Sequence, residues 1–208
     1  MKKSLLTLLL AVAMAVPIFA ADKGAMEVDI KAGIPLSQEL KEEVPSKNET
    51  YDVETTFSLG ADFFYYIDSN IAIGAGVDHI FSSKVKYGNG YPGEDKISYT
   101  NIYLQAKYNF VLNNDIFNNI YPIVQLGYGI FSFDVDTKYY VPGTKIEGEN
   151  GLYWAIGVGT TIKENFIVEL LYSFDYGKTK AKGGYSLYPE IDTTYKILKL
   201  NIGYKFNI

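Results

Sequence analysis

The feature that most constrains this chain is a strict alternation of apolar and polar residues along most of its length. From Phe166 to Tyr176, every second residue is apolar or aromatic, and the positions between them include Glu169 and Asp175. The segment 194–207 repeats the pattern. Successive side chains of a β-strand point to opposite faces, so a period of two indicates strands with one apolar and one polar face. The alternation predicts an all-β fold.

Alternating segments recur along the chain, and the connectors between them are short and long in turn. Each segment reaches the length of about 9–11 residues that a tilted strand needs to cross a bilayer. The segments are 25–34, 53–67, 71–82, 97–111, 120–132, 151–162, 166–176 and 194–207. The short connectors are 68–70, 112–119 and 163–165, and the long ones are 35–52, 83–96, 133–150 and 177–193. Tight turns at one end and large loops at the other are typical of transmembrane β-barrels.

The polar face of these segments carries too many ionisable side chains to form a dry core, because each unpaired buried charge costs several kcal/mol. We therefore expect this face to line a lumen, where acids and lysines can pair, and the apolar face to contact lipid. The prediction is an eight-stranded antiparallel up-and-down transmembrane β-barrel; a soluble barrel with an apolar interior is the alternative. The predicted lumen network comprises Glu27, Asp29, Lys31, Glu54, Asp62, Asp78, Gln105, Lys107, Gln125, Glu169, Asp175, Lys199 and Lys205.

Aromatic residues gather near both ends of the predicted apolar face, and the chain has 19 Tyr and 12 Phe. Rings of aromatic side chains at the two headgroup layers flank the aliphatic band of membrane barrels. We expect these residues to lie at the membrane interfaces rather than to stack on a ligand. The predicted interface aromatics are Phe63, Tyr65, Tyr108, Phe110, Phe166, Tyr172, Phe174, Tyr176, Tyr204 and Phe206.

The N-terminal residues have the composition of a secretory signal peptide. Two lysines precede an apolar run from Leu5 to Val16, and Ala20 offers a small residue for cleavage. The run is too short and wrongly flanked for a membrane span. We expect residues 1–20 to be removed and residues 21–208 to form one barrel with four long external loops.

Composition excludes several classes of function. The chain has no Cys, which excludes disulfide frameworks and thiolate metal sites, and its single His leaves no histidine cluster for a metal. The net charge of −5 becomes more negative when the leader is lost, which argues against a nucleic-acid partner. We expect no catalytic residues, no cofactor and no metal ion.

The single histidine, His79, is expected on the lipid face near the outer rim. With a neighbouring serine it would resemble a lipid-modifying barrel enzyme, whose Ser–His pair lies on the outer wall. The alternation instead places Ser82 on the lumen side, and Ser83 lies farther along the chain. We interpret His79 as a polar residue of the interface, beside Phe81.

Three short motifs resemble those of small outer-membrane barrels. The segment Tyr121–Gly129 (YPIVQLGYG) resembles their P-x-V-x-x-G-x-G strand, Val168–Tyr172 (VELLY) resembles an E-L-x-Y strand, and Ile202–Phe206 is similar to their C-terminal insertion signal. The chain ends at Ile208, two residues past the aromatic that usually stands last. The chain thus resembles the OmpA-barrel, OmpX and OmpW-like family. That resemblance implies a Gram-negative-type outer membrane, insertion by the barrel-assembly machinery and no common enzymatic activity.

The expected function follows from this architecture. We expect a surface, structural or adhesion-type role through the external loops, with outer-membrane lipids and lipopolysaccharide around the wall and a host or cell-surface ligand at the loops. A small pore or a passage for hydrophobic molecules is one alternative. A lipid-modifying enzyme on the same scaffold is another.

Overall fold

The structure, a computed structural model, describes most of the chain after its first 22 residues. The predicted signal peptide and the middle of each predicted external loop lie outside the described residues. The described ranges are 23–44, 47–86, 95–112, 116–134, 145–163, 165–182 and 191–208. Within these ranges, no helix is long and apolar enough to cross a membrane.

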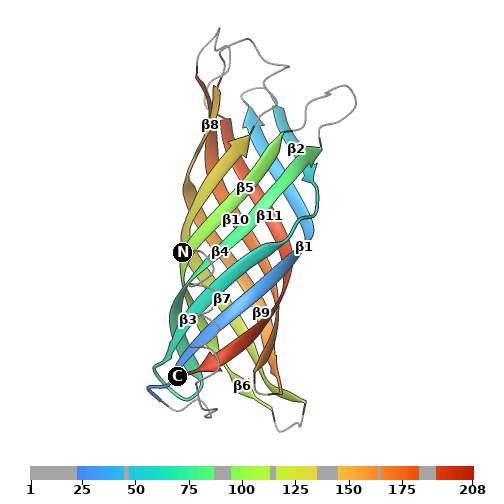
Figure 1. The fold of residues 1–208 in the computed structure, drawn as a ribbon. Coiled ribbons are helices and arrows are strands. Elements are labelled where there is room, and N and C mark those ends of the chain that lie inside the picture. The colour runs from blue at the N-terminus through green and yellow to red at the C-terminus, as the bar shows by residue number, and fades with distance from the viewer. Residues whose placement is uncertain are drawn as a thin grey trace, which may run out of the picture.

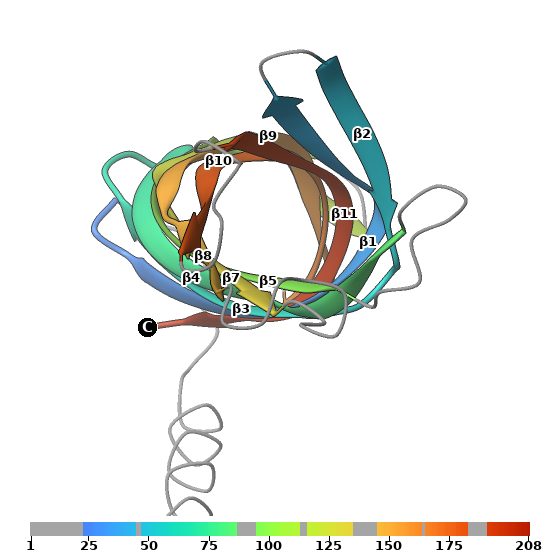
Figure 2. The ribbon, with the colours of Figure 1, turned by 90° about the horizontal axis from the view of Figure 1, so that it is seen from above.

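The described strands form a closed antiparallel ring (Figures 1 and 2). Eight of them pair in the order β11-β1-β3-β4-β5-β7-β9-β10, and β10 pairs with β11 to close the ring. The predicted eight-stranded barrel is therefore confirmed. The ring strands are β1 (Met26–Val44), β3 (Ser58–Tyr66), β4 (Ile71–Lys86), β5 (Lys96–Tyr108), β7 (Phe117–Asp134), β9 (Gly151–Ile162), β10 (Phe166–Lys182) and β11 (Ile191–Asn207).

Three short strands extend members of the ring. Strand β2 (Lys47–Val53) precedes β3, β6 (Phe110–Val111) follows β5, and β8 (Lys145–Glu149) precedes β9. In the view along the axis, β2 lies outside the circle of the ring (Figure 2). It pairs with the end of β1 over six residue pairs and with β4 over two.

The two ends of the barrel differ as predicted. At one end, residues 67–70 join β3 to β4 and residues 163–165 join β9 to β10, and the C-terminus lies at the same end (Figure 1). The Asp68 carbonyl accepts a hydrogen bond from the Ile71 amide at 3.2 Å, which tightens the first of these turns. The described ends of β1, β4, β7 and β10 lie at the opposite end. We call the turn end inner and the loop end outer.

The apolar face of the wall points outward from the inner end of the barrel up to the outer extensions of the strands. Leu170 and Ile202 are 40% and 55% exposed, whereas Glu169 and Lys199 on the same strands are 1% and 4% exposed. Exposed apolar side chains continue around all eight strands as a belt that only lipid can cover without a large hydrophobic penalty. This face assignment agrees with the prediction.

The strands run well beyond the predicted segments, and the predicted loop 35–52 is mostly strand. A bulge between Pro35 and Ser37 shifts the phase of β1, so that Gln38 and Leu40 point inward after Gly33 and Pro35. Outside the membrane, the outward face meets water and is polar, while the inward face becomes apolar. The phase shift and this inversion make the segment look like a polar loop, which is why the prediction ended β1 too early.

Candidate functional site

The lumen within the apolar belt, which we call the inner lumen, is built around buried lysines. The Lys107 ammonium forms an ion pair with Glu27 and lies 4.0 Å from Asp29 Oδ2. The Tyr66 hydroxyl donates a hydrogen bond to the other Glu27 oxygen at 2.7 Å, and Lys205 Nζ lies 3.8 Å from that oxygen. At the inner end, the Glu27 carboxylate therefore interacts with Lys107, Lys205 and the Tyr66 hydroxyl.

The next layer outward is centred on Lys31. Its ammonium pairs with Asp62 and with Glu169, the latter at 2.8 Å. The Tyr103 hydroxyl donates to Asp62 at 2.8 Å, and the Tyr121 hydroxyl donates to Glu169 at 3.1 Å. These phenols share the lumen with the ion pairs and donate to both acids, so a layer with two carboxylates and one ammonium has each carboxylate hydrogen-bonded.

The upper part of the inner lumen combines another ion pair with neutral hydrogen bonds. Lys199 Nζ lies 2.5 Å from Asp78 Oδ2. On β5 and β7, the Gln125 amide donates to Gln105 at 3.0 Å and accepts from the Tyr153 hydroxyl of β9 at 2.6 Å. Buried polar networks of this kind hold a unique arrangement because each unmade bond would be costly.

Asp29 is one of two buried lumen acids, with Asp175, whose carboxylate oxygens both lack a hydrogen-bond partner among the described residues. The cation nearest to Asp29 is Lys107 at 4.0 Å. Lys107 is already engaged by Glu27 and lies over the Phe64 ring, 3.8 Å from its centroid. Asp29 is therefore farther from Lys107 than Glu27 and the Phe64 ring are.

The lumen beyond the membrane belt, which we call the outer lumen, is apolar. The Tyr99 and Tyr195 rings stack in parallel with centroids 4.3 Å apart, and Phe131 tilts against Tyr99 at 4.8 Å. Its buried members are Leu40, Val53, Ile80, Val85, Ile97, Tyr99, Phe131, Tyr195 and Ile197. They come from six of the ring strands or their extensions, and β9 and β10 contribute none of them.

The structure brings together most of the predicted lumen residues. Eleven of the thirteen are buried, and Lys205 is partly exposed at the inner end. Glu54 is the exception: it is exposed and lies in the break between β2 and β3. The prediction assumed an unbroken strand from residue 53, and the irregular stretch before Ser58 changes the phase. The Glu54 backbone N–H donates a hydrogen bond to the Lys84 carbonyl, and the Glu54 side chain points into solvent.

The outer lumen was missed by sequence reasoning. A signal for it exists: Gln38, Leu40 and Glu42 continue the period of two after the bulge in β1, and Ser83 and Val85 continue it after the bulge that follows Ile80 in β4. Without the bulge positions, these residues cannot be assigned to a face.

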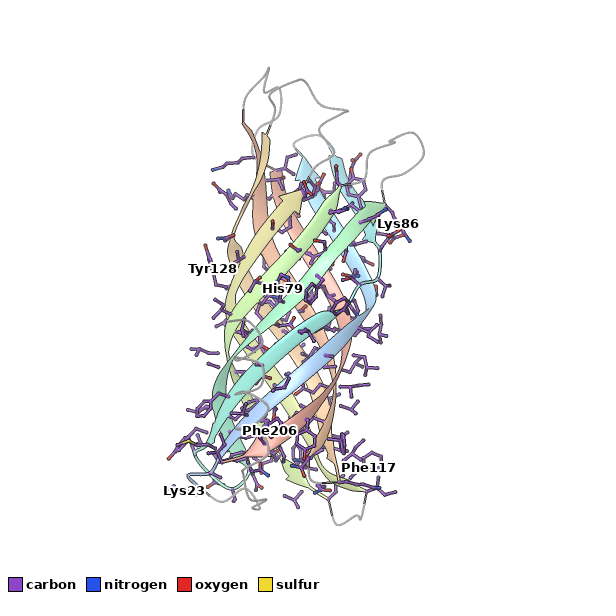
Figure 3. The ribbon with its side chains drawn as sticks, in the orientation of Figure 1. Lys23, His79, Lys86, Phe117, Tyr128 and Phe206 are labelled. Atoms are coloured by element: carbon purple, nitrogen blue, oxygen red, sulfur yellow. The ribbon has the colours of Figure 1, made fainter. Side chains whose placement is uncertain are left out.

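The predicted interface aromatics lie on the outer wall. Phe63, Tyr65, Tyr108 and Phe110 are exposed at the inner end, where Phe117 and Phe206 also lie (Figure 3). The remaining members, Phe166, Tyr172, Phe174, Tyr176 and Tyr204, lie on β10 and β11. Phe174 is half-buried because Trp154 stacks on it, with centroids 4.2 Å apart and planes 12° from parallel.

His79 lies on the outer wall, between the two ends of the barrel (Figure 3). Its Nδ1 is 2.8 Å from Thr100 Oγ1, and its ring contacts the Phe81 ring edge-on. The bulge between Ile80 and Ser83 reverses the predicted serine positions: Ser82 is exposed and Ser83 is buried.

The outer rim carries acidic side chains above the outer lumen. Glu42 is opposite Glu49 in the β1–β2 register. Burial, together with the nearby Glu49 and Asp95 charges, raises the pKa of Glu42 above its usual value. Among the described residues, no group of three or more His, Asp or Glu side chains has the arrangement to hold a metal ion.

Comparisons with known proteins point to one family. A family model described as outer membrane protein beta-barrel domain matches residues 6–206. Among solved structures, outer membrane protein OprG from Pseudomonas aeruginosa is 14% identical with a TM-score of 0.63, covering 92% of this chain and 99% of its own. Ail, the attachment invasion locus protein of Yersinia pestis, is 12% identical with a TM-score of 0.45, covering 88% and 99%. A comparison with curated protein sequences finds no significant match.

Proposed function

Because this chain belongs to the outer membrane β-barrel protein family and resides in the outer membrane of a Gram-negative-type bacterium, we propose that it is a closed, non-conducting barrel. In this proposal, the barrel anchors a rigid rim above the membrane, and the rim performs a surface, structural or adhesion-type role. Its surroundings are outer-membrane lipids and lipopolysaccharide, and its rim would contact a host or cell-surface ligand.

The observation that carries the proposal is the filled lumen. The inner lumen is occupied by ion pairs and phenols, and the outer lumen by the apolar cluster around Tyr99 and Tyr195. An eight-stranded barrel has an interior just wide enough for side chains to fill. A hydrated ion would have to displace both the network and the cluster to pass.

The rim supports a display role because strands continue into it. Strands β1 and β2 pair over six residue pairs beyond the bulge, and β8 pairs with β10 over five. Lys180 and Glu149 form an ion pair at 2.5 Å across the second of these pairings. Paired strands present side chains in fixed positions, which lowers the entropy lost when a partner binds.

Single-channel recording in planar lipid bilayers tests the proposal. We expect no discrete conductance steps from the intact barrel at neutral pH. The double variant Leu40→Ala, Tyr195→Ala empties only part of the outer lumen and should also give no steps, because the ion pairs and phenols of the inner lumen remain in place. Steady conductance by the unaltered protein would overturn the closed-barrel proposal.

Passage of hydrophobic molecules is a second candidate, favoured by the apolar lining of the outer lumen. A molecule could enter among Leu40, Ile97 and Ile197 if those side chains moved apart. Uptake of a fluorescent hydrophobic probe into vesicles would distinguish the candidates, because a closed barrel should not accelerate it. We further propose that the barrel is not an enzyme: His79 has Thr100 as its hydrogen-bond neighbour, and Ser83 points away from it into the lumen.

A further inference from the structure

A row of side chains crosses the outer wall at the edge of the apolar belt. Trp154 of β9 is opposite Phe174 of β10, Phe174 is opposite Lys196 of β11, and Lys196 is opposite Glu39 of β1. None of the four is buried, so all belong to the outward face. Directly opposed residues in an antiparallel pair have Cβ atoms about 4.5–5.5 Å apart, so the row forms a continuous surface.

The row climbs out of the membrane toward β1. On β10, the apolar belt continues outward past Phe174 to Tyr176. On β11, the belt ends at Leu198, two residues before Lys196 is reached, and on β1 it ends at Leu36, before Glu39. From Phe166 at the inner interface to Phe174 is eight residues, or about 20 Å of height for a strand tilted near 40°. Phe174 therefore lies near the outer edge of a hydrocarbon band about 25 Å tall.

The aromatic part of the row leaves one face of the Trp154 indole without a ring contact among the described residues, because Phe174 covers only the other face. Trp154 is the single tryptophan of the chain. It stacks on Phe174, whose edge is supported by Tyr172 at 4.8 Å and 80°. The face of an aromatic ring is partly negative and attracts the C–H bonds on the flat side of a sugar ring.

Lys196 gives the row a positive charge that forms no ion pair among the described residues. Three lysines of the outer region have carboxylate partners, namely Lys41 with Glu43, Lys178 with Asp192, and Lys180 with Glu149, whereas Lys86, Lys96 and Lys196 have none among the described residues. Among the described residues, no carboxylate lies within 4 Å of Lys196, although the exposed Glu39 is its cross-strand neighbour. A lysine at this depth extends its ammonium to the headgroup layer, where phosphates are the available anions.

From this arrangement, we infer that Trp154, Phe174 and Lys196 form a binding site for the headgroup of a phosphorylated glycolipid of the outer leaflet. The sugar ring lies against the face of Trp154 that Phe174 does not cover, and its phosphate pairs with Lys196. Glu39 repels a phosphate placed farther out and so confines it to Lys196. The inference rests on the proposed lipid contacts of the wall, and it does not depend on whether the lumen conducts.

Because Trp154 is the only tryptophan, its fluorescence reports on this site alone. We would reconstitute the barrel in phosphatidylcholine nanodiscs containing increasing fractions of bisphosphorylated lipid A. The expected result is a saturable change in Trp154 emission. Lys196→Gln should raise the half-saturating fraction about 10-fold, as expected for loss of a charge-assisted contact, while Lys178→Gln should leave it unchanged. Heat-modifiable migration in gels confirms that each variant is folded.

Three further arms separate the possible sources of the signal. Dephosphorylated lipid A should lack the Lys196-dependent part, phosphatidylglycerol should not reproduce the saturable change, and soluble glucosamine phosphate should have no effect. An equal response to phosphatidylglycerol, or equal half-saturation for Lys196→Gln and the unaltered protein, would overturn the site. Neither result would affect the conductance test of the closed barrel.

Discussion

The inner and outer lumen are built by the same strands, yet their chemistry is opposite. Where the wall faces lipid, the outward side chains are apolar and the inward ones are charged, as with Leu170 and Glu169. Beyond the bulge in β1, the outward Glu39 and Lys41 are polar and the inward Leu40 is fully buried. The solvent outside the wall thus determines which face is apolar, and the interior takes the complementary residues.

This difference implies two mechanisms of stabilisation. The inner lumen depends on ion pairs such as Lys31–Glu169, whose stability requires both partners. The outer lumen depends on packing among side chains such as Tyr99 and Tyr195, whose stability scales with buried volume. Substitutions in the two regions should therefore lower the free energy of unfolding for different reasons: loss of an ion-pair partner in the inner lumen and loss of packed volume in the outer lumen.

The largest effect is expected for Lys107→Met in the inner lumen. The substitution removes the cation nearest to Glu27. It also removes the lysine that lies 4.0 Å from Asp29. Removing one partner of a buried ion pair costs about 3–5 kcal/mol. Urea titration of folding into lipid vesicles measures the loss. Lys178→Met is the control, since its ion pair with Asp192 is solvent-exposed and should contribute about 1 kcal/mol or less; equal losses would show that burial does not set the cost.

A smaller loss is expected for Leu40→Ala in the outer lumen. This change removes a fully buried side chain from the apolar cluster, at a cost of about 2–3 kcal/mol. The matched control is Leu36→Ala on the same strand, which removes a side chain that is 55% exposed on the outer wall. The same urea titration compares them. A Leu36 variant that loses as much as the Leu40 variant would contradict the assignment of Leu40 to the interior.

Replacing Asp29 should stabilise the inner lumen, unlike replacing its neighbours. Asp29→Asn removes a charge that has no hydrogen bond among the described residues, with an expected gain of about 1 kcal/mol. Asp62→Asn should instead destabilise, because Asp62 pairs with Lys31 and accepts from Tyr103. Folding midpoints in urea at neutral pH provide the test. A destabilised Asp29 variant would indicate that Asp29 supports Lys107 more than Glu27 does.

The smallest effect is a pH dependence of the outer rim. Because its folded pKa is raised, Glu42 binds its proton more tightly in the folded rim than in the unfolded chain. Its unfavourable contribution is absent below the usual value of 4.5 and grows as pH rises through the raised pKa, so the β1–β2 pairing should loosen toward neutral pH. Hydrogen exchange of β2 amides, corrected for intrinsic rates, detects this. Glu42→Gln should abolish the trend and Glu43→Gln should not.

The sequence predicted the membrane part of the barrel because each strand there separates charged from apolar side chains completely. It predicted the face of Lys107 or Glu27, but not that these residues meet across 80 positions of sequence. That contact depends on the stagger between strands, which alternation does not encode. Glu54 and Ser82 were assigned to the wrong face because each follows or precedes an irregularity that changes the phase.

The glycolipid site illustrates a further limit. Phe174 was predicted as an interface aromatic, but its opposition to Trp154 and Lys196 requires the registers of three strands. Composition alone shows one tryptophan and many lysines.

The central claim is that the lumen is closed between its two ends, and thiol modification tests it most directly. The chain has no cysteine, so Ala155→Cys introduces a single thiol beside Tyr103 and Tyr153 in the inner lumen, with little change in volume. In lipid vesicles, a small water-soluble thiol reagent should leave this position unmodified while rapidly modifying Asp52→Cys on the exposed rim. Modification of both positions at similar rates would contradict the closed lumen.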